Sequence, residues 1–152
     1  MYKQILCPID GSSTSNCGMH EAIQLAKDQN AKIEFLNVID NYFPIIDMSG
    51  DAHYTDITDI LRENGKKTLE DAEETARLSG VSVSSKLVES MGQVSKAIIN
   101  EVSKCHADLI VMGTHGIRGF ERLVMGSDAE TVARTSPVPV LLVRDKQLTK
   151  EQ

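Results

Sequence analysis

Short apolar runs alternate along the whole chain with segments in which apolar residues recur every three or four positions. The runs are typical of buried strands, and the recurring segments are typical of helices that bury one face. Because strands that alternate with helices are joined by right-handed crossovers, the pattern predicts an α/β fold. We expect a Rossmann-like, open, twisted, five-stranded parallel sheet with helices on both faces. The strands are predicted at 5–9, 31–39, 81–87, 107–112 and 138–143, and the helical stripes at 19–26, 56–76, 94–102 and 129–133.

The length of the chain suits a single domain. Its 152 residues can bury a sizeable core without disulfides or metals. We expect that domain to cover residues 1–145, followed by a polar tail at 146–152. After the second strand, Asn41–Thr55 carries Pro44 and Gly50 and has no clear period. A connection of this length in a compact domain is typical of a lid or a mobile segment.

The composition excludes several classes of function. Acidic residues number 22 and basic residues 16, which gives a net charge of −6. Proteins that bind nucleic acids or anionic membranes are normally basic, so we expect neither partner. No apolar run approaches the about 20 residues of a membrane-spanning helix, and no signal peptide is visible. Three cysteines without a Cys-x-x-Cys pair indicate neither a disulfide framework nor a zinc site, so a cytoplasmic protein is expected.

The last predicted strand, Val138–Val143, contains Pro139. Proline cannot donate a hydrogen bond to a neighbouring strand, so this strand belongs at an edge of the sheet. An apolar edge strand is prone to unwanted pairing unless something covers it. We therefore expect a homodimer in which two copies of this strand pair.

Two turns are the places where such a fold binds ligands. In open parallel sheets the ligand lies at the carboxyl ends of the strands where the strand order reverses, here after the first and fourth strands. Asp10-Gly11-Ser12-Ser13 follows the first strand, and its serines can cap the helix behind it. The fourth strand ends at Gly113, and the loop behind it runs to Gly126 and Ser127 at the start of the last helix.

This second loop has the features of a phosphate cradle. Glycines let backbone N–H groups approach an anion, and a helix N-terminus adds free N–H groups and a partial positive charge. Arg118 and Arg122 against Glu121 leave the loop a formal charge of +1. The commoner signatures are absent: there is no P-loop, no dinucleotide fingerprint after the first strand and no nucleophile elbow.

At this loop the chain resembles the universal stress protein family, and specifically its ATP-binding branch. The signature of that branch is the spacing G-x2-G-x9-G-[ST], which Gly113, Gly116, Gly126 and Ser127 fill without a gap. The likeness extends to the segments 5–12, 107–113 and 137–144, and it is weakest across 41–55. It therefore covers nearly the whole chain.

The resemblance implies an adenine nucleotide laid across the strand ends. Asp10 corresponds to the acid that accepts from the ribose hydroxyls, and Pro8 shapes the pocket wall beside it. Val38 corresponds to the residue whose backbone meets the adenine edge. The three glycines and the serine of the signature would hold the phosphates, and Mg²⁺ or Mn²⁺ would bridge phosphate oxygens without side-chain ligands. Arg118 and His115 are candidates for further phosphate contacts. The family also pairs its last strands into a dimer, in agreement with the proline argument.

Asp128 departs from the family pattern, which has a neutral residue after the serine. We include it among the candidate binding residues. A carboxylate there could weaken the binding of a triphosphate or favour a less charged nucleotide such as AMP. Alternatively, it could be a first-turn acid that complements the helix dipole.

Several of these residues also have simpler roles. Ser127 and Glu130 match a capping box, which would make Ser127 the N-cap of the last helix. Asp10-Gly11 is a dipeptide that favours turns. His115 is more often a solvated loop residue than a catalytic one, and no pair of base and nucleophile is apparent in the sequence.

The sequence therefore predicts an ATP-binding stress-response protein without catalytic residues. We expect a nucleotide-gated regulator with at most slow ATP hydrolysis, in which ATP orders Asn41–Thr55 and Gly113–Gly126 for an unknown protein partner. One alternative is a dimeric interaction module that does not bind ATP or prefers AMP. A less favoured alternative is an ATP-consuming enzyme of a related α/β fold, whose Ser-Gly-Gly-x-Asp-Ser signature is absent after the first strand.

Overall fold

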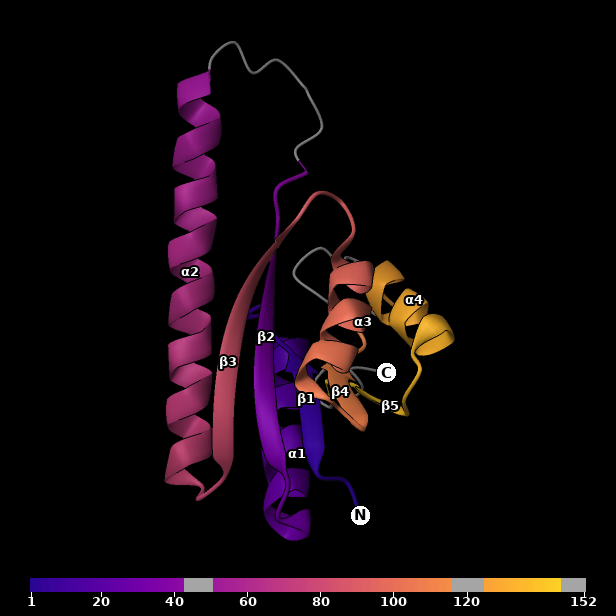
Figure 1. Cartoon of the computed structure of the whole chain (residues 1–152). Helices are drawn as coiled ribbons and strands as arrows, with labels where there is room; N and C mark the ends of the chain where they lie inside the picture. Colours follow the sequence, from indigo (N-terminus) through magenta and orange to yellow (C-terminus); the bar gives the residue numbers. More distant parts are fainter. Residues whose placement is uncertain (43–50, 116–124, 146–152) are drawn as a thin grey trace, which may run out of the picture.

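The computed structural model describes residues 1–42, 51–115 and 125–145, with the backbone alone for 51–56. Strands and helices alternate along the chain as the sequence predicts (Figure 1). The strands are β1 Gln4–Pro8, β2 Lys32–Asp40, β3 Ser82–Ser90, β4 Leu109–Gly113 and β5 Val140–Val143. The helices are α1 Ser13–Gln29, α2 Asp51–Leu78, α3 Val94–Cys105 and α4 Ser127–Thr135.

The strands form one parallel sheet in the order β3-β2-β1-β4-β5. The connections run outward from β1 to β2 and β3, and then return to the other side for β4 and β5. The strand order thus reverses between β1 and β4, as expected. The last residue of β1, Pro8, pairs with Leu36, so β2 continues beyond β1 as far as Asp40. This overhang forms one wall of a hollow at the carboxyl ends of the strands.

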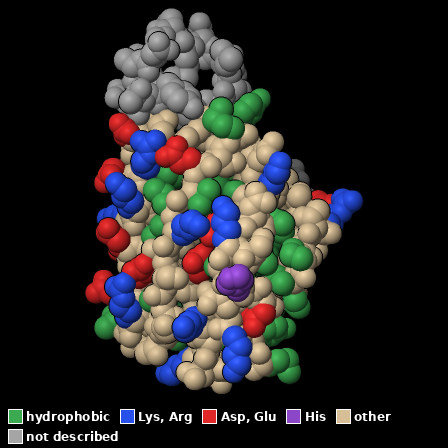
Figure 2. Space-filling view, in the orientation of Figure 1, with side chains coloured by type: hydrophobic (Ala, Val, Ile, Leu, Met, Phe, Trp, Pro, Cys, Tyr) green, Lys and Arg blue, Asp and Glu red, His purple; other side chains and the backbone are tan. Residues whose placement is uncertain are grey.

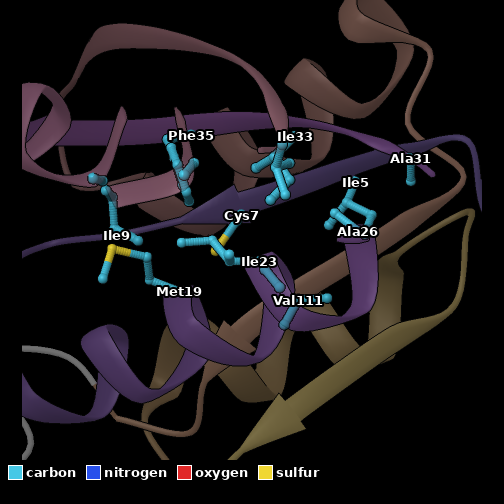
Figure 3. Packing of buried hydrophobic residues seen from close by; sticks show 14 of the residues in the cluster. Ile5, Cys7, Ile9, Met19, Ile23, Ala26, Ala31, Ile33, Phe35 and Val111 are labelled. Carbon is cyan, nitrogen blue, oxygen red and sulfur yellow. The ribbon is translucent and has the colours of Figure 1, made fainter. Parts of the chain in front are cut away.

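One face of the sheet carries α1 and α2. Ile5, Cys7 and Val111 of the sheet pack there against Met19 and Ile23 of α1 (Figure 3). These sheet residues share one face because alternate side chains of a strand point to opposite sides. Burial raises the pKa of the Cys7 thiol, so this cysteine is a core side chain rather than a nucleophile.

The opposite face of the sheet carries α3 and α4, which lie together across the sheet from α2 (Figure 1). Leu6, Leu36 and Ile110 of the three central strands pack there against Ile98 of α3 and Val132 of α4. Burial of such side chains stabilises the fold by about 1.5–3 kcal/mol each. The two helices thereby start close together at the same end of the sheet as the hollow.

The edge strand β5 is shorter than predicted. The prediction of a strand over Val138–Val143 was wrong at its start, because β5 begins at Val140. Pro139 has no N–H to donate and precedes the strand, while its carbonyl oxygen accepts a 3.0 Å hydrogen bond from the Ile110 N–H. The edge position itself is confirmed, since β5 pairs with β4 alone.

The second helix is longer than predicted. It begins at Asp51 rather than near Asp56, so part of the predicted connection is helical. Ile60 was predicted on the buried side of this helix but is 59% exposed, whereas Leu69 is buried as predicted. The rest of the predicted connection, and most of the loop after β4, lie in 43–50 and 116–124, outside the described residues.

Helix α1 and strand β4 approach each other closely at two glycines. A Cβ atom on Gly113 would lie 2.7 Å from the backbone oxygen of Thr14, and one on Gly18 would lie 3.0 Å from the nitrogen of Gly113. Real Cβ atoms essentially never come as close to another atom as the first of these distances. The backbone of the first turn of α1 therefore rests directly on the end of β4. This contact holds together the two chain segments that lead into the hollow.

A charged cluster lies on the α3 side of the sheet, over β2 and β3. Glu101 of α3 is 2% exposed and pairs with the Lys86 ammonium at 2.6 Å and with Lys104 at 3.8 Å. Acidic and basic side chains are mixed over this view of the molecule (Figure 2). Burial, and then the charge of Glu101, raise the pKa of Glu34 in β2, and its Oε1 atom has no hydrogen-bond partner among the described residues.

The contact between α1 and β4 leads to a first prediction. We expect Gly113→Ala to lower the free energy of unfolding by about 1–3 kcal/mol, because the added methyl group meets backbone rather than a movable side chain. Urea denaturation followed by circular dichroism measures the loss. The control is Glu70→Ala on the exposed face of α2, which should change stability by less than about 0.5 kcal/mol. Equal stability of the two variants would contradict a fixed contact between α1 and β4.

A second prediction concerns Glu34. Because the folded state raises its pKa, the folded state binds the proton more tightly than the unfolded state does. The charged form therefore costs stability, and this cost appears as the pH rises through the folded pKa. Glu34→Gln should stabilise the protein at about pH 7, and the gain should shrink as the pH falls to about 4.5. Urea midpoints at both pH values test this, with the exposed Glu70→Gln as control; a gain that grows on acidification would contradict it.

Candidate functional site

A cavity of about 430 Å³ lies at the carboxyl ends of β1, β2 and β4. Its walls come from both layers of the fold, since α2 closes one side and the first turns of α3 and α4 close the other. Leu36, Val38, Ile98 and Met112 supply apolar surface. Polar groups gather at the strand ends and at the start of α4. The cavity thus suits a ligand with one flat, apolar part and one charged part.

The end of β1 contributes Pro8, Ile9 and Asp10 to the cavity. The Asp10 carboxylate accepts a 2.9 Å hydrogen bond from the Ser12 N–H, which closes a turn directly after the strand. The Ser12 hydroxyl in turn accepts from the Ser15 N–H at 3.2 Å and caps α1, as predicted. Asp10 therefore does serve a turn, and its carboxyl group also lines the cavity.

The overhanging end of β2 supplies Asn37, Val38 and Asp40. The Asn37 side chain is buried and donates a 2.9 Å hydrogen bond to the Ile9 carbonyl, so it joins β2 to the end of β1. A Cβ atom on Gly65 of α2 would lie 2.6 Å from the Asn37 Oδ1. A larger residue at this position would force the Asn37 amide or α2 to shift, so the glycine lets α2 form the wall of the cavity at this distance.

The loop after β4 returns to the cavity at Gly126. The Gly126 N–H donates a 2.8 Å hydrogen bond to the Thr114 carbonyl, which ties the start of α4 to the end of β4. Gly126 is the N-cap of α4, and no side chain among the described residues caps the helix there. The capping box predicted for Ser127 and Glu130 was therefore wrong, because Ser127 is already the first residue of the helix. The N-terminus of α4 faces the cavity with Ser127, Asp128 and Ala129 along the lining.

Asp128 connects the two helices of this layer. Its Oδ1 atom accepts a 3.2 Å hydrogen bond from the Ser95 N–H in the first turn of α3. The N-cap of α3, Gln93, makes no capping hydrogen bond with its own side chain. A carboxylate from α4 thus satisfies an N–H group at the start of α3 and complements its dipole. Asp128 lies in the first turn of α4, as the interpretation of a first-turn acid predicted. However, the helix N-terminus that its carboxylate contacts is that of the neighbouring helix α3.

The structure brings most of the predicted site residues together. Those that line this cavity are Pro8, Asp10, Val38, Gly113, His115, Gly126, Ser127 and Asp128. The His115 ring lies 2.9 Å from the Thr114 hydroxyl, Nδ1 to Oγ1. Gly116 and Arg118 lie outside the described residues. The close contact with Thr14 also gives Gly113 a packing reason to be glycine, apart from any ligand.

For some residues that line the cavity, the sequence gives little indication of a binding role. Asn64, Gly65 and Thr68 reach the cavity from the middle of α2 and look like ordinary polar positions on a helix. Asn37 does carry a signal, because it is a polar residue within the apolar run of β2. A buried amide needs partners, and this one finds the Ile9 carbonyl.

Neither a metal centre nor a membrane span is evident in the part of the chain that the structure describes. Within 1–42, 51–115 and 125–145, no group of three or more His, Cys, Asp or Glu side chains is placed to hold a metal ion. Across the same residues, no helix combines the length and the apolar character needed to cross a membrane.

Comparisons with known proteins agree with this architecture. The sequence model of the universal stress protein family matches residues 1–144. Universal stress protein MJ0531 of Methanocaldococcus jannaschii is 34% identical over 144 residues, which are 95% of this chain and 83% of that protein. A universal stress protein family member from Burkholderia pseudomallei has a similar structure, with a TM-score of 0.77, 31% identity, and coverage of 93% of this chain and 95% of that one.

Nucleotide complexes occur among the similar structures. A universal stress protein in complex with cAMP matches with a TM-score of 0.66 and 28% identity, covering 93% of this chain and 97% of that chain. With the sheet order, the position of the cavity and the match along 1–144 in agreement, this chain belongs to the universal stress protein family.

Proposed function

We propose that this chain binds an adenine nucleotide, ATP or AMP, at the carboxyl ends of β1, β2 and β4 and acts as a nucleotide-dependent regulator in the stress response. The observation that carries the proposal is the cavity at the point where the strand order reverses. It has apolar surface at one end and, at the other, a helix N-terminus that no side chain of the described residues caps. Binding of cAMP by a family member supports a nucleotide as the ligand.

The order of the strands matches the order of the parts of a nucleotide. Val38 lies on β2, at the apolar end of the cavity. Asp10 follows the central strand β1, and Gly126 and Ser127 lie at the start of α4, beyond β4. Two strand spacings separate β2 from β4, which is about 10 Å. We place the base beside Val38, the ribose at Asp10 and the phosphate at the start of α4. The N–H groups of a first helical turn and its dipole favour an anion at that place.

The residues around the phosphate end fit a divalent cation held through the ligand. The proposed adenine nucleotide would carry Mg²⁺ or Mn²⁺ on its phosphate oxygens, and the cation would neutralise part of the phosphate charge. The polar groups that line this end include backbone N–H groups of α4, the Ser127 hydroxyl and the Asp128 carboxylate. We therefore assign the cation no set of side-chain ligands.

Binding is better supported than catalysis. The lining of the cavity includes His115 and Asp10, but Asp10 accepts from a backbone N–H and the His115 ring lies beside Thr114. We therefore assign neither residue a catalytic role, and we propose that ATP hydrolysis is at most slow. We propose that the nucleotide changes the surface that a protein partner meets, and that two copies of the chain associate through the edge of β5.

The proposed role of Asp10 gives a third prediction. Asp10→Asn keeps an oxygen that can accept from the Ser12 N–H but removes the charged acceptor for the ribose hydroxyls. We expect AMP to bind about tenfold more weakly to the variant, because hydrogen bonds to charged groups contribute about 1.5–3 kcal/mol. Titration calorimetry measures the affinity, and thermal unfolding checks that the variant is folded.

The 2′-deoxy nucleotide is the matched control for this experiment. With dAMP one ribose hydroxyl is missing, so Asp10→Asn should cost less affinity with dAMP than with AMP. Equal losses with the two nucleotides would place Asp10 away from the 2′-hydroxyl. The absence of saturable binding of AMP and ATP by the native protein would contradict the proposed function itself.

The proposed dimer gives a fourth prediction. Leu141 in β5 is 38% exposed at the open edge of the sheet, where a second copy would cover it. Light scattering should give twice the 16.7 kDa mass of one chain for the native protein, and Leu141→Asp should shift it toward the monomer. Leu78→Asp is the control, because Leu78 is 83% exposed at the far end of α2. A native protein that is monomeric at micromolar concentration would contradict the dimer.

A further inference from the structure

The N-termini of two helices meet at the phosphate end of the cavity, and they differ in their partners among the described residues. In α4 the first-turn N–H groups have no capping side chain among the described residues. In α3 the Ser95 N–H already donates to the Asp128 carboxylate at 3.2 Å. The chain therefore supplies its own anion to the N-terminus of α3, while the N-terminus of α4 has no capping side chain from the described part of the chain and faces the cavity.

The two helix N-termini and the Asp128 carboxylate carry opposite charges of similar size. Each helix N-terminus is equivalent to about half a positive charge, so two of them offer about one. Asp128 brings one negative charge, and it stands on the cavity lining between them. The N-terminus of α4 can still hold one phosphate with its N–H groups. Each further phosphate adds negative charge beside a fixed carboxylate.

From this arrangement we infer that Asp128 determines specificity: it makes the site favour nucleotides with one phosphate over those with three. The inference rests on the proposed function, because it concerns the same cavity. The Ser95 N–H holds the Asp128 carboxylate at the cavity lining, and from there its charge repels the outer phosphates.

The variant Asp128→Asn tests the charge of this residue without removing its hydrogen bond to α3. An asparagine Oδ1 atom can accept from the Ser95 N–H in the same way, so the start of α3 keeps its partner while the negative charge is gone. The matched control is Glu130→Gln in the same first turn of α4. Glu130 pairs at the surface with Arg134 at 3.5 Å and is not part of the cavity lining, so its charge should not act on a phosphate there.

The experiment is titration calorimetry of ATP and AMP against the native protein and both variants, first in the presence of a chelator and then with Mg²⁺. The native protein should bind AMP more tightly than ATP in the chelator. Asp128→Asn should raise the ratio of ATP affinity to AMP affinity by about three- to tenfold, as expected for one charge removed at a partly solvated distance. Glu130→Gln should leave this ratio within about twofold. Mg²⁺ should reduce the difference between the native and Asp128→Asn ratios, because it neutralises phosphate charge.

A measurement on the native protein alone gives a second test. If Asp128 repels the outer phosphates, added salt should raise the ratio of ATP affinity to AMP affinity by screening that repulsion. An unchanged ratio in Asp128→Asn, or a native ratio that falls with salt, would overturn the inference while leaving the proposed function intact. Failure of both nucleotides to bind to the native protein and to both variants would overturn the proposed function, and this inference with it.

Discussion

The central strand β1 is the constraint on which the rest of the structure depends. It pairs with β2 on one side and β4 on the other, and its interior residues are buried beneath helices on both faces. A strand with no free edge and no free face can meet solvent only at its ends. Because β2 continues past Pro8 while β1 stops, the backbone that leaves β1 opens into a hollow that β2 already walls on one side. The position of the cavity follows from this difference in strand length.

The polar groups around the cavity also hold the fold together. Asp10 closes the turn after β1, Asn37 joins β2 to that turn, and Asp128 links α4 to the start of α3. Each of these bonds satisfies a backbone group beyond the end of a strand or at the start of a helix, where the regular hydrogen bonding of the element stops. The groups that face the cavity are therefore held in place before any ligand arrives. Such an arrangement lowers the entropic cost of ordering the site on binding.

Glycines set the distances between the layers. Gly18 and Gly113 let α1 rest on β4, and Gly65 lets α2 approach Asn37. Two of these three positions, Gly113 and Gly65, lie on the cavity lining. The close approach of α2 to the Asn37 side chain at Gly65 therefore helps to set the distance of this helix from the cavity.

The sequence by itself determined the order and type of the strands and helices, the reversal of strand order beside β1, and the turns that carry Asp10 and Gly126. These features depend on the spacing of apolar residues along the chain and on residues with strong backbone preferences, and both can be recognised without a structure. Only the tertiary structure decided that β5 begins after Pro139, that Ser127 lies inside α4 rather than at its cap, and that Asn64, Gly65 and Thr68 reach the cavity. It also decided that the Asp128 carboxylate contacts the first turn of α3. The physical reason is that each of these depends on which residues, far apart in the chain, the parallel sheet brings to the same end.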